Sequence, residues 1–462
     1  MRVTPTETGK SQQGSAEQQL SLAEALQFIQ PERAMGHYAT AIQQGIRDPR
    51  AYCNLAALLI KQKRHAEAVQ VCDAGLAVCG ENIQILSNCG SALGHLARYG
   101  EALDRFRRQA KMQSPQEAPW CAMGHVLQRM GHLKEAEECF RVASHFEQPN
   151  APIGLAQTLL LAGRLREGFQ EYERRWESDL MKKEARGFKA PKWDGSNPSN
   201  KTILLWAEQG YGDTIQFVRY APVVAASGAK VKLAVQKRLV ELVALMPGNF
   251  EILVIDSALH GFDFHCPLMS LPHLCDTEMD NIPPPASFNL PLEREQDWRQ
   301  RLEASDQLKV AVAWAGSSTH ADDHNRSIGL ALLRPLFELP MRFFSVQVGG
   351  PADQIQEEKL NGRLTDLSPW LTTFLETACA LSQMDLVITV DTAVAHLAGS
   401  LEVTVWTLLP YAPDFRWLLG RQDSPWYPTM RLFRQPAPTD WDGVVAQVRS
   451  ELIKRHAHWK RI

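Results

Sequence analysis

Two short segments of this chain place polar side chains directly after an apolar run. Gly-Tyr-Gly-Asp occupies residues 210–213, after a strand that is predicted at residues 202–209, and Asp213 is the carboxylate that this turn presents. Such a carboxylate can take a proton from an attacking hydroxyl, as a general base does. It can equally cap the helix that is predicted to begin at Thr214, and the sequence leaves both roles open. Glu208 is a weaker candidate for the base.

The second segment, Asp-Thr-Ala-Val-Ala-His at 391–396, follows an apolar, β-branched run at 386–390 that predicts a buried parallel strand. Asp391 and Thr392 are favourable helix N-caps, so a helix should begin directly after them. Its first backbone N–H groups and its dipole would bind an anion, such as a nucleotide diphosphate, beyond the end of the strand. His396 could donate to a phosphate or sugar oxygen, or it could be a hydrogen-bonded core histidine.

Other polar and aromatic residues extend this set. One predicted strand ends in Gly316 and Ser317, and Arg326 in the following loop could pair bidentately with phosphate or form a surface salt bridge. Trp426 and Tyr427 could stack on a sugar or base, or pack in the core. The candidate residues for binding a ligand with a diphosphate group, called donor-binding residues below, are Gly316, Ser317, Arg326, Gln347, Asp391, Thr392 and His396. The candidate acceptor and cleft residues are Gln209, Gly210, Tyr211, Gly212, Trp426 and Tyr427.

The elements that must position these residues alternate between strand and helix patterns, which favours parallel sheets. A Pro-rich crossing at 282–286 divides the alternation into two Rossmann-like α/β halves, residues 201–290 and 291–462. Turn-forming residues at 186–200 indicate a linker before them. Two such halves with a hinge are the outline of the GT-B glycosyltransferase fold, in which the first half binds the acceptor and the second half binds the nucleotide sugar.

The region before the linker repeats every 34 residues. Glu-Ala pairs begin at positions 67, 101 and 135, and Arg-Ala stands at the corresponding place in the first unit. This period and its small residue resemble the tetratricopeptide repeat, so residues 20–185 are predicted to form an α-solenoid of helix pairs. Its groove would bind a protein or form a dimer surface. Asn54 and Asn88, 34 residues apart, could hold a peptide backbone or be ordinary solvated or turn-bonded side chains.

Composition narrows the classes of function. The net charge of −3 over 462 residues does not favour nucleic acid or an anionic membrane as a partner. No apolar run approaches the roughly 20 residues that a bilayer requires, and the polar N-terminus lacks the apolar part of a signal peptide, so we expect a cytoplasmic protein. Residues 1–19 are expected to be disordered. No Asp-x-Asp pair follows a strand and six of the nine cysteines lie in helical patterns without Cys-x-x-Cys spacing, so neither a metal nor a cofactor is expected.

Residues 190–440 resemble heptosyltransferase-like glycosyltransferases of family 9, on the strength of Gly-Tyr-Gly-Asp and Asp-Thr-Ala-Val-Ala-His. Together with the repeats, the layout looks like bacterial repeat-containing glycosyltransferases, some of which modify flagellin. The resemblance implies that Asp213 is the catalytic base and that the 391–396 segment contacts the diphosphate and sugar of the donor. It also implies a basic phosphate contact in the loop after the first strand of the second half, where Arg326 is preferred over His324.

We therefore expect an inverting, metal-independent glycosyltransferase that moves a sugar from a nucleotide sugar to a protein recruited by the repeats, Ser or Thr of flagellin being one such acceptor. Two alternatives remain. The same chemistry could act on lipopolysaccharide or another glycan, with the repeats serving assembly. In the other alternative, the repeats form a scaffold and the transferase half is inactive. The nucleotide, the sugar and the oligomeric state, a homo-oligomer included, stay open.

Overall fold

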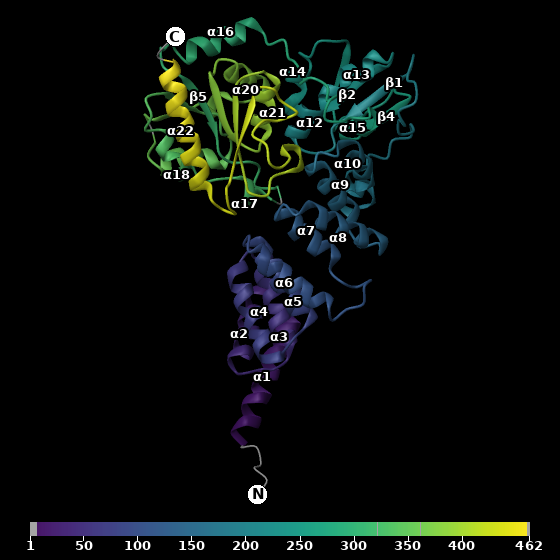
Figure 1. Cartoon of the computed structure of the whole chain (residues 1–462), viewed down its shortest axis with the longest axis vertical. Helices are drawn as coiled ribbons and strands as arrows, with labels where there is room; N and C mark the ends of the chain where they lie inside the picture. The colour runs from purple at the N-terminus through teal and green to yellow at the C-terminus, as the bar shows by residue number, and fades with distance from the viewer. Residues whose placement is uncertain (1–6, 321, 361, 460–462) are drawn as a thin grey trace. The chain divides into compact units, whose positions relative to one another are not determined.

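The computed structural model describes residues 7–320, 322–360 and 362–459 (Figure 1). The chain divides into two compact units, residues 1–155 and 156–462. The first unit is helical throughout its described residues. The second contains two parallel β-sheets with short helices between the strands. This architecture confirms the predicted order of a helical repeat region followed by a parallel-sheet α/β region.

Consecutive helices joined by short turns make up the first unit. They are α1 (Glu7–Leu26), α2 (Pro31–Gln43), α3 (Pro49–Lys61), α4 (His65–Cys79), α5 (Ile83–His95), α6 (Tyr99–Ala110), α7 (Trp120–Arg129), α8 (Leu133–His145) and α9 (Ala151–Leu161), which crosses the boundary to the second unit. The second helix of each predicted repeat buries its recurring small residue completely, at Ala34, Ala68, Ala102 and Ala136. Residues without long side chains let neighbouring helices approach closely, so the 34-residue period has a direct packing cause.

The recurring glutamate has a local partner. Glu67 binds Arg64 at 2.7 Å, and the same contact recurs at the same distance 34 residues later. The first unit reverses the arrangement, because Arg33 stands at the glutamate position and donates to Gln30 at 2.7 Å. These exposed pairs lie at the start of each second helix, where water screens them, so each contributes little to stability. They therefore mark where the helices begin, whereas the buried alanines hold the repeats together.

The start of the chain differs from the expectation. Disorder was predicted for residues 1–19, but α1 begins at Glu7 and continues to Leu26. Ala16, Leu20 and Ala23 are buried and α1 packs against α2. Their spacing puts them on one helix face, although the Gln, Ser and Glu residues around them make the segment polar on average. Residues 1–6 of the predicted tail lie outside the described residues.

Two parallel sheets organise the second unit. The four-stranded sheet has the order β3 (Phe250–Val254), β2 (Lys230–Val235), β1 (Thr202–Trp206) and β4 (Phe264–Pro267). The six-stranded sheet has the order β10 (Met430–Arg434), β9 (Val405–Leu409), β8 (Leu386–Val390), β5 (Lys309–Ala313), β6 (Arg342–Ser345) and β7 (Leu364–Asp366). The central strand β8 is buried at every residue, as the apolar run predicted. Apolar runs did not reveal β4, β7 or β10, which are short or rich in polar residues.

Helices cover these sheets. They are α10 (Leu165–Tyr172), α11 (Asp179–Glu184), α12 (Tyr211–Phe217), α13 (Ala221–Ala226), α14 (Val240–Val243), α15 (Leu271–Leu274), α16 (Leu292–Arg301), α17 (Asp323–Arg326), α18 (Leu330–Leu333), α19 (Gln354–Glu357), α20 (Phe374–Leu381), α21 (Ala393–Ser400) and α22 (Trp441–Trp459). The last of them, drawn in yellow in Figure 1, buries Trp441, Val444 and Val448 in the core of the six-stranded sheet. Short 3₁₀ turns complete the unit, among them η1 (Glu173–Glu177) and η8 (Phe415–Trp417).

The boundary between the compact units lies earlier than the predicted end of the repeats. The repeats were predicted to reach residue 185, whereas the second unit begins at residue 156 and so includes α10. Phe169 of α10 explains the difference, because its ring lies 6.2 Å from Phe217 and 6.3 Å from Trp426, centroid to centroid. Residues 186–200, the predicted linker, contain bends, a turn and one isolated bridge at Lys192.

Candidate functional site

The two segments that the sequence singled out lie against each other. Residues 210–213 form the N-cap and first turn of α12, which follows β1. Residues 391–396 lead from β8 into the first turn of α21, and α12 packs on α21. A Cβ atom at Gly212 would lie 2.8 Å from Cδ2 of His396 and 3.6 Å from Cα of Ala393. A side chain at residue 212 would therefore force the helices apart, and glycine is what permits the approach. The carboxyl ends of β1 and β8 meet at this junction.

Asp213 has a different partner on each carboxylate oxygen. Oδ2 accepts a hydrogen bond from the backbone N–H of Gly210 at 2.8 Å. Asp213 therefore caps α12, which begins at Tyr211 rather than at Thr214. Oδ1 accepts a hydrogen bond from Nη2 of Arg416, with which Asp213 forms an ion pair. The side chain keeps 20% of its surface exposed, so the carboxylate lies at the edge of the junction rather than within the core.

Arg416 is the residue of this site that the sequence analysis missed. It lies in η8, in the loop after β9. Its Nε donates to Oε1 of Gln216 at 2.8 Å and its Nη1 donates to Oδ1 of Asp414 at 2.7 Å. Burial lowers the pKa of Arg416, but the carboxylates of Asp414 and Asp213 outweigh that effect and raise it, so the guanidinium stays charged. The available signal was the arginine's place in a loop directly after a buried strand.

His396 is a buried, neutral imidazole. Its exposed fraction is 4%, and its ring stacks on Trp417 with centroids 5.4 Å apart. Nδ1 is hydrogen-bonded to the hydroxyl of Tyr427 at 3.0 Å. Burial holds the pKa of His396 well below its usual range, and the nearby arginines, Arg416 first among them, act in the same direction. These contacts support the interpretation of His396 as a hydrogen-bonded core histidine, and its Nε2 edge lies beside Gly212.

Asp391 and Thr392 begin α21 as predicted. The hydroxyl of Thr392 accepts a hydrogen bond from the N–H of Val394 at 3.2 Å and caps the helix. The carbonyl of Asp391 accepts a hydrogen bond from Nη1 of Arg326 at 3.2 Å. Burial, followed by the charge of Asp414, raises the pKa of the Asp391 side chain to about 6. This carboxyl is therefore partly protonated near neutral pH.

The loop after β5 brings a second guanidinium to the junction. Arg326 packs directly over Gly316, where a Cβ atom would lie 2.5 Å from Nη2. Its Nε forms a long contact of 3.3 Å with Asp323, and the side chain is 18% exposed. Ser317 is exposed and pairs with the hydroxyl of Thr319 at 2.8 Å. Of the predicted donor-binding residues in this loop, Arg326 is thus the one that the fold holds at the start of α21.

Gln347 has a structural role in place of the predicted contact with a donor. It is buried, and its Oε1 accepts hydrogen bonds from the N–H groups of Trp314 at 3.0 Å and Ala315 at 2.9 Å. Its Nε2 donates to the carbonyls of Ala315 at 3.1 Å and Val348 at 3.3 Å. The amide is committed to the backbone at the ends of β5 and β6, so it shapes the loop that carries Gly316 without facing a ligand.

Trp426 and Tyr427 form packing contacts, one of the two roles that the sequence left open. They are 1% and 0% exposed, which excludes stacking on a sugar or a base in this conformation. Trp426 lies 6.0 Å from Phe217, and the guanidinium of Arg219 lies over the rings of Trp426 and Tyr427 at 5.6 and 4.9 Å. The Trp-Tyr pair, which has a Pro on each side, thus packs the region of α12 against the part of the chain that contains the six-stranded sheet.

Of the remaining predicted cleft residues, Gln209 supports the glycine loop and Tyr211 lies at the surface. Nε2 of Gln209 donates to the hydroxyl of Tyr172 at 3.0 Å, and its carbonyl accepts from Gln236 at 2.7 Å, so Gln209 anchors the glycine loop. Tyr211 is 36% exposed and lies 5.0 Å from the ring of Phe374. Tyr211 is therefore the aromatic residue of the predicted set that remains accessible at the junction.

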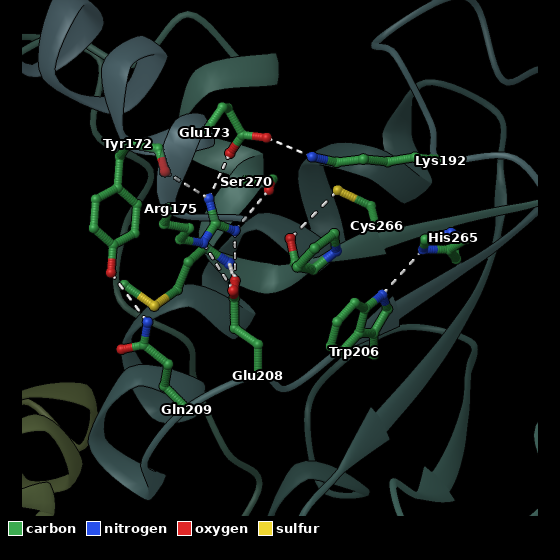
Figure 2. Close-up of polar contacts among 12 residues, drawn as sticks. Tyr172, Glu173, Arg175, Lys192, Trp206, Glu208, Gln209, His265, Cys266 and Ser270 are labelled. Carbon is green, nitrogen blue, oxygen red and sulfur yellow. Dashed lines mark hydrogen bonds and ion pairs between the residues drawn. The ribbon is translucent and has the colours of Figure 1, made fainter. Parts of the chain in front are cut away.

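Glu208, the weaker candidate for the base, belongs to a buried charge cluster (Figure 2). Its two carboxylate oxygens accept hydrogen bonds from Nε and Nη2 of Arg175, both at 2.9 Å, and each side chain is 1% exposed. Arg175 also donates to Ser270 at 2.9 Å and to Glu173 at 2.8 Å, and Lys192 binds the other oxygen of Glu173. Glu208 is thus committed to a structural pair and cannot reach a substrate, which leaves Asp213 as the candidate base.

The two asparagines of the repeats are engaged within the first unit. Nδ2 of Asn54 donates to the hydroxyl of Tyr38 at 3.0 Å. Nδ2 of Asn88 donates to the carbonyl of Cys53 at 2.9 Å, and its Oδ1 accepts from Gln84 at 3.2 Å. Both side chains are therefore bonded to other helices of the repeats, which is neither the predicted ladder for a peptide backbone nor the solvated or turn-bonded alternative.

The junction combines a carboxylate with cations of fixed geometry. Asp213 can accept a proton, and the guanidinium groups of Arg416 and Arg326 match the geometry of phosphate oxygens. Among the described residues, no group of three or more His, Cys, Asp or Glu side chains is arranged to hold a metal ion. Within the same residues, no helix combines the length and the apolar character needed to cross a bilayer.

Comparison with known proteins identifies the repeats. The profile of the tetratricopeptide repeat matches residues 49–81 and 118–143. Over 444 residues the chain is 26% identical to Protein FlbA of Caulobacter vibrioides, covering 86% of this chain and 72% of that protein. Among solved structures, MamA of Desulfovibrio magneticus aligns over 36% of this chain and 96% of the MamA chain, with 15% sequence identity and a TM-score of 0.33. YrrB, a tetratricopeptide-repeat protein, aligns over 35% of this chain and 85% of the YrrB chain, with 20% sequence identity and a TM-score of 0.31. The chain thus contains tetratricopeptide repeats, followed by a parallel-sheet α/β region.

Proposed function

We propose that this protein is an inverting glycosyltransferase with a nucleotide sugar as donor and a protein as acceptor. Asp213 accepts the proton of an acceptor hydroxyl, and the oxygen of that hydroxyl forms a bond to the anomeric carbon of the donor. The bond between this carbon and the diphosphate oxygen breaks, and its electron pair leaves with the nucleoside diphosphate. A single displacement of this kind inverts the configuration of the anomeric carbon and needs stabilisation of charge on the leaving group.

The contact between residues 210–213 and 391–396 is the observation that carries the proposal. A general base must reach the hydroxyl that attacks the carbon bound to phosphate, so the base and the phosphate-binding groups must belong to one site. The junction puts Asp213 beside the start of α21 and beside Arg416. β1 and β8, each in the interior of its own parallel sheet, both end there, which supports a GT-B arrangement of two halves.

The leaving diphosphate has candidate partners at the start of α21. Arg326 is held against the carbonyl of Asp391 and carries a full positive charge, and the first backbone N–H groups of α21 add the positive end of a helix dipole. His396 contributes a hydrogen bond rather than a charge, because its pKa is well below neutral. When the hydroxyl of Tyr427 donates to Nδ1, the ring proton resides on Nε2, the edge beside Gly212.

The repeats support a protein acceptor. Tetratricopeptide arrays bind proteins or peptides, and a transferase fused to such an array can hold its acceptor while the sugar is moved. The similarity to Protein FlbA extends over 86% of this chain and so includes both regions, which supports one activity that uses both. From the family resemblance, flagellin is the acceptor that we would test first, and we place the reaction in the cytoplasm.

Thermal unfolding with a panel of nucleotides and nucleotide sugars tests the donor site. ADP, UDP, GDP, CMP and their sugar conjugates form the panel. A matching nucleotide at about 100 times its dissociation constant should stabilise the protein by about 2.7 kcal/mol. Arg326→Ala should reduce this shift. Arg334→Ala is the matched control, because Arg334 is 47% exposed and binds Glu358, away from the junction.

Sugar transfer tests the chemistry. Wild-type protein, the donor found above and purified flagellin should give a labelled acceptor, and dialysis against EDTA should leave the rate unchanged. Asp213→Asn should abolish transfer while nucleotide binding persists. Transfer to a purified glycan in place of any protein would assign the acceptor to the glycan class. No stabilisation by any nucleotide and no transfer would refute the enzyme and leave the repeats as a scaffold.

A further inference from the structure

Asp213 is not poised as a base in the arrangement described above. One of its oxygens accepts the backbone N–H of Gly210 and the other is paired with Arg416. Each carboxylate oxygen of Asp213 is therefore already engaged by a donor, so an acceptor hydroxyl has to displace one of these contacts. An enzyme that relies on Asp213 must therefore weaken one of them before the acceptor hydroxyl can be deprotonated. The capping bond lies within one helix turn, whereas the pair with Arg416 joins two segments 203 residues apart.

The contacts of Arg416 show which of its bonds can open. Asp414 lies on the same loop, and its Oδ1 also accepts the backbone N–H of Arg416 at 3.0 Å, so this pair is local to the turn. Gln216 is fully buried and holds Nε. Nη2 faces Asp213, which lies on α12 one turn before Gln216. Asp213 is the more exposed of the two partners, at 20% against 9%, so the bond between them lies at the accessible edge.

A diphosphate is a suitable competitor for that corner. It carries at least two negative charges and presents several acceptor oxygens, whereas Asp213 carries one charge and offers Nη2 a single oxygen. Gln216 adds a donor, because its Nε2 is buried and has no hydrogen-bond partner among the residues that the structure describes. Arg416, together with Gln216, therefore has the chemistry to take a phosphate group that arrives next to Arg326.

We propose that Arg416 is a phosphate-binding residue of the transfer site that exchanges Asp213 for the donor diphosphate and thereby frees Asp213 to act as the base. This inference depends on the proposed function. It makes the reaction ordered: the donor binds first, Arg416 turns from Asp213 to the diphosphate, and only then does Asp213 have an oxygen available for the acceptor hydroxyl. Asp213 would remain anchored by its bond to the Gly210 N–H.

A double-mutant cycle on nucleoside diphosphate binding tests the exchange. ADP, UDP and GDP are titrated by calorimetry into the wild-type protein, Asp213→Asn, Arg416→Gln and the double variant. Removing the competing carboxylate should tighten diphosphate binding about tenfold when Arg416 is present, a coupling within the range found for contacting residues. In the Arg416→Gln background, the same substitution should change nothing. Asp423→Asn is the control for charge alone, since Asp423 is 70% exposed and pairs with Arg421.

Each result bears on the inference. An equal gain in both backgrounds would show simple charge repulsion by Asp213, and no gain in either would show that the pair does not compete; both overturn the exchange while the proposed function stands. Binding by no variant would overturn both proposals. The tenfold gain without sugar transfer by any form of the protein would keep Arg416 as a diphosphate ligand and refute the transferase. If Arg416→Gln does not fold, Arg416→Lys replaces it, and the gain should then fall to a few-fold because lysine lacks the planar fork.

Discussion

Replacing Arg175 by methionine should destabilise residues 156–462 by about 3–5 kcal/mol, because the carboxylate of Glu208 would remain buried without its partner. The magnitude follows from the geometry in Figure 2. Both side chains are 1% exposed, two parallel bonds of 2.9 Å join them, and water has no access to compensate the lost charge. Arg175 also gives up its bond to Ser270 at 2.9 Å.

Urea unfolding followed by tryptophan fluorescence measures this effect. Trp120 is the only tryptophan of the sequence within residues 1–155, and the other eleven of the twelve lie beyond it, so the signal reports on the second unit. Arg174→Met is the matched control. Arg174 is 41% exposed and pairs with Glu171 and Glu177, so its loss should cost no more than about 1 kcal/mol.

The pH dependence identifies the cause. Burial raises the pKa of Glu208, although Arg175 opposes the rise, and removal of Arg175 raises the pKa further. A carboxyl group with a raised pKa in the folded state contributes stability that is fully present below the unfolded pKa of about 4.3 and is lost as the pH rises through the folded pKa. The deficit of Arg175→Met should therefore shrink as the pH falls towards about 4.

A second substitution completes this test. Glu208→Gln in the Arg175→Met background removes the buried charge and should recover most of the lost stability at neutral pH. A deficit that stays the same at low pH and in the double variant would refute the reasoning, because lost packing rather than an unpaired carboxylate would then be responsible.

Gly212→Ala should destabilise the protein by about 1–3 kcal/mol and weaken nucleotide-dependent stabilisation in thermal unfolding, because its Cβ would lie 2.8 Å from His396. Adding His396→Ala should relieve the clash, and no relief would place the strain elsewhere. Gly90→Ala should cost a similar amount, about 1–3 kcal/mol by circular dichroism, since its Cβ would lie 2.7 Å from an aromatic ring of α6. Gly100→Ala, whose Cβ would meet nothing within 4 Å, is the control. Burial raises the pKa of Asp391 to about 6, so the contribution of Asp391 to stability is fully present below its unfolded pKa of about 3.9 and should fall by roughly 1–3 kcal/mol as the pH rises through 6. Asp391→Asn should flatten this part of the urea midpoint profile, and an unchanged slope would contradict the assignment.

Local patterns predicted most of the framework. The 34-residue period marks the helix pairs, because each repeat solves the same packing problem with the same small residue at the same place. Apolar runs likewise predicted β1, β5 and β8, and the capping residues at Thr392 predicted the start of α21. Where a signal was sparse, as at Ala16 and Leu20 of α1, average composition concealed the helix.

Roles that depend on partners from distant segments were not predictable in this way. Trp426 and Tyr427 have the residue types of a sugar platform, yet they are core residues because Phe169 and Phe217 surround one and His396 binds the other. Gln347, which follows β6, was predicted to contact a ligand, but its side-chain amide is hydrogen-bonded to backbone groups.

By itself, the sequence determined that this protein contains tetratricopeptide repeats followed by parallel-sheet α/β structure, and that Asp213 and His396 each follow a strand. These features depend on residues a few positions apart, or on a fixed period, so their physics is local. Only the tertiary structure decided that Asp213 meets Arg416, that Glu208 is locked to Arg175, and that Gly212 lets two helices touch. Such contacts depend on where whole strands and loops come to lie after the core has packed, and no local spacing of residues encodes that position.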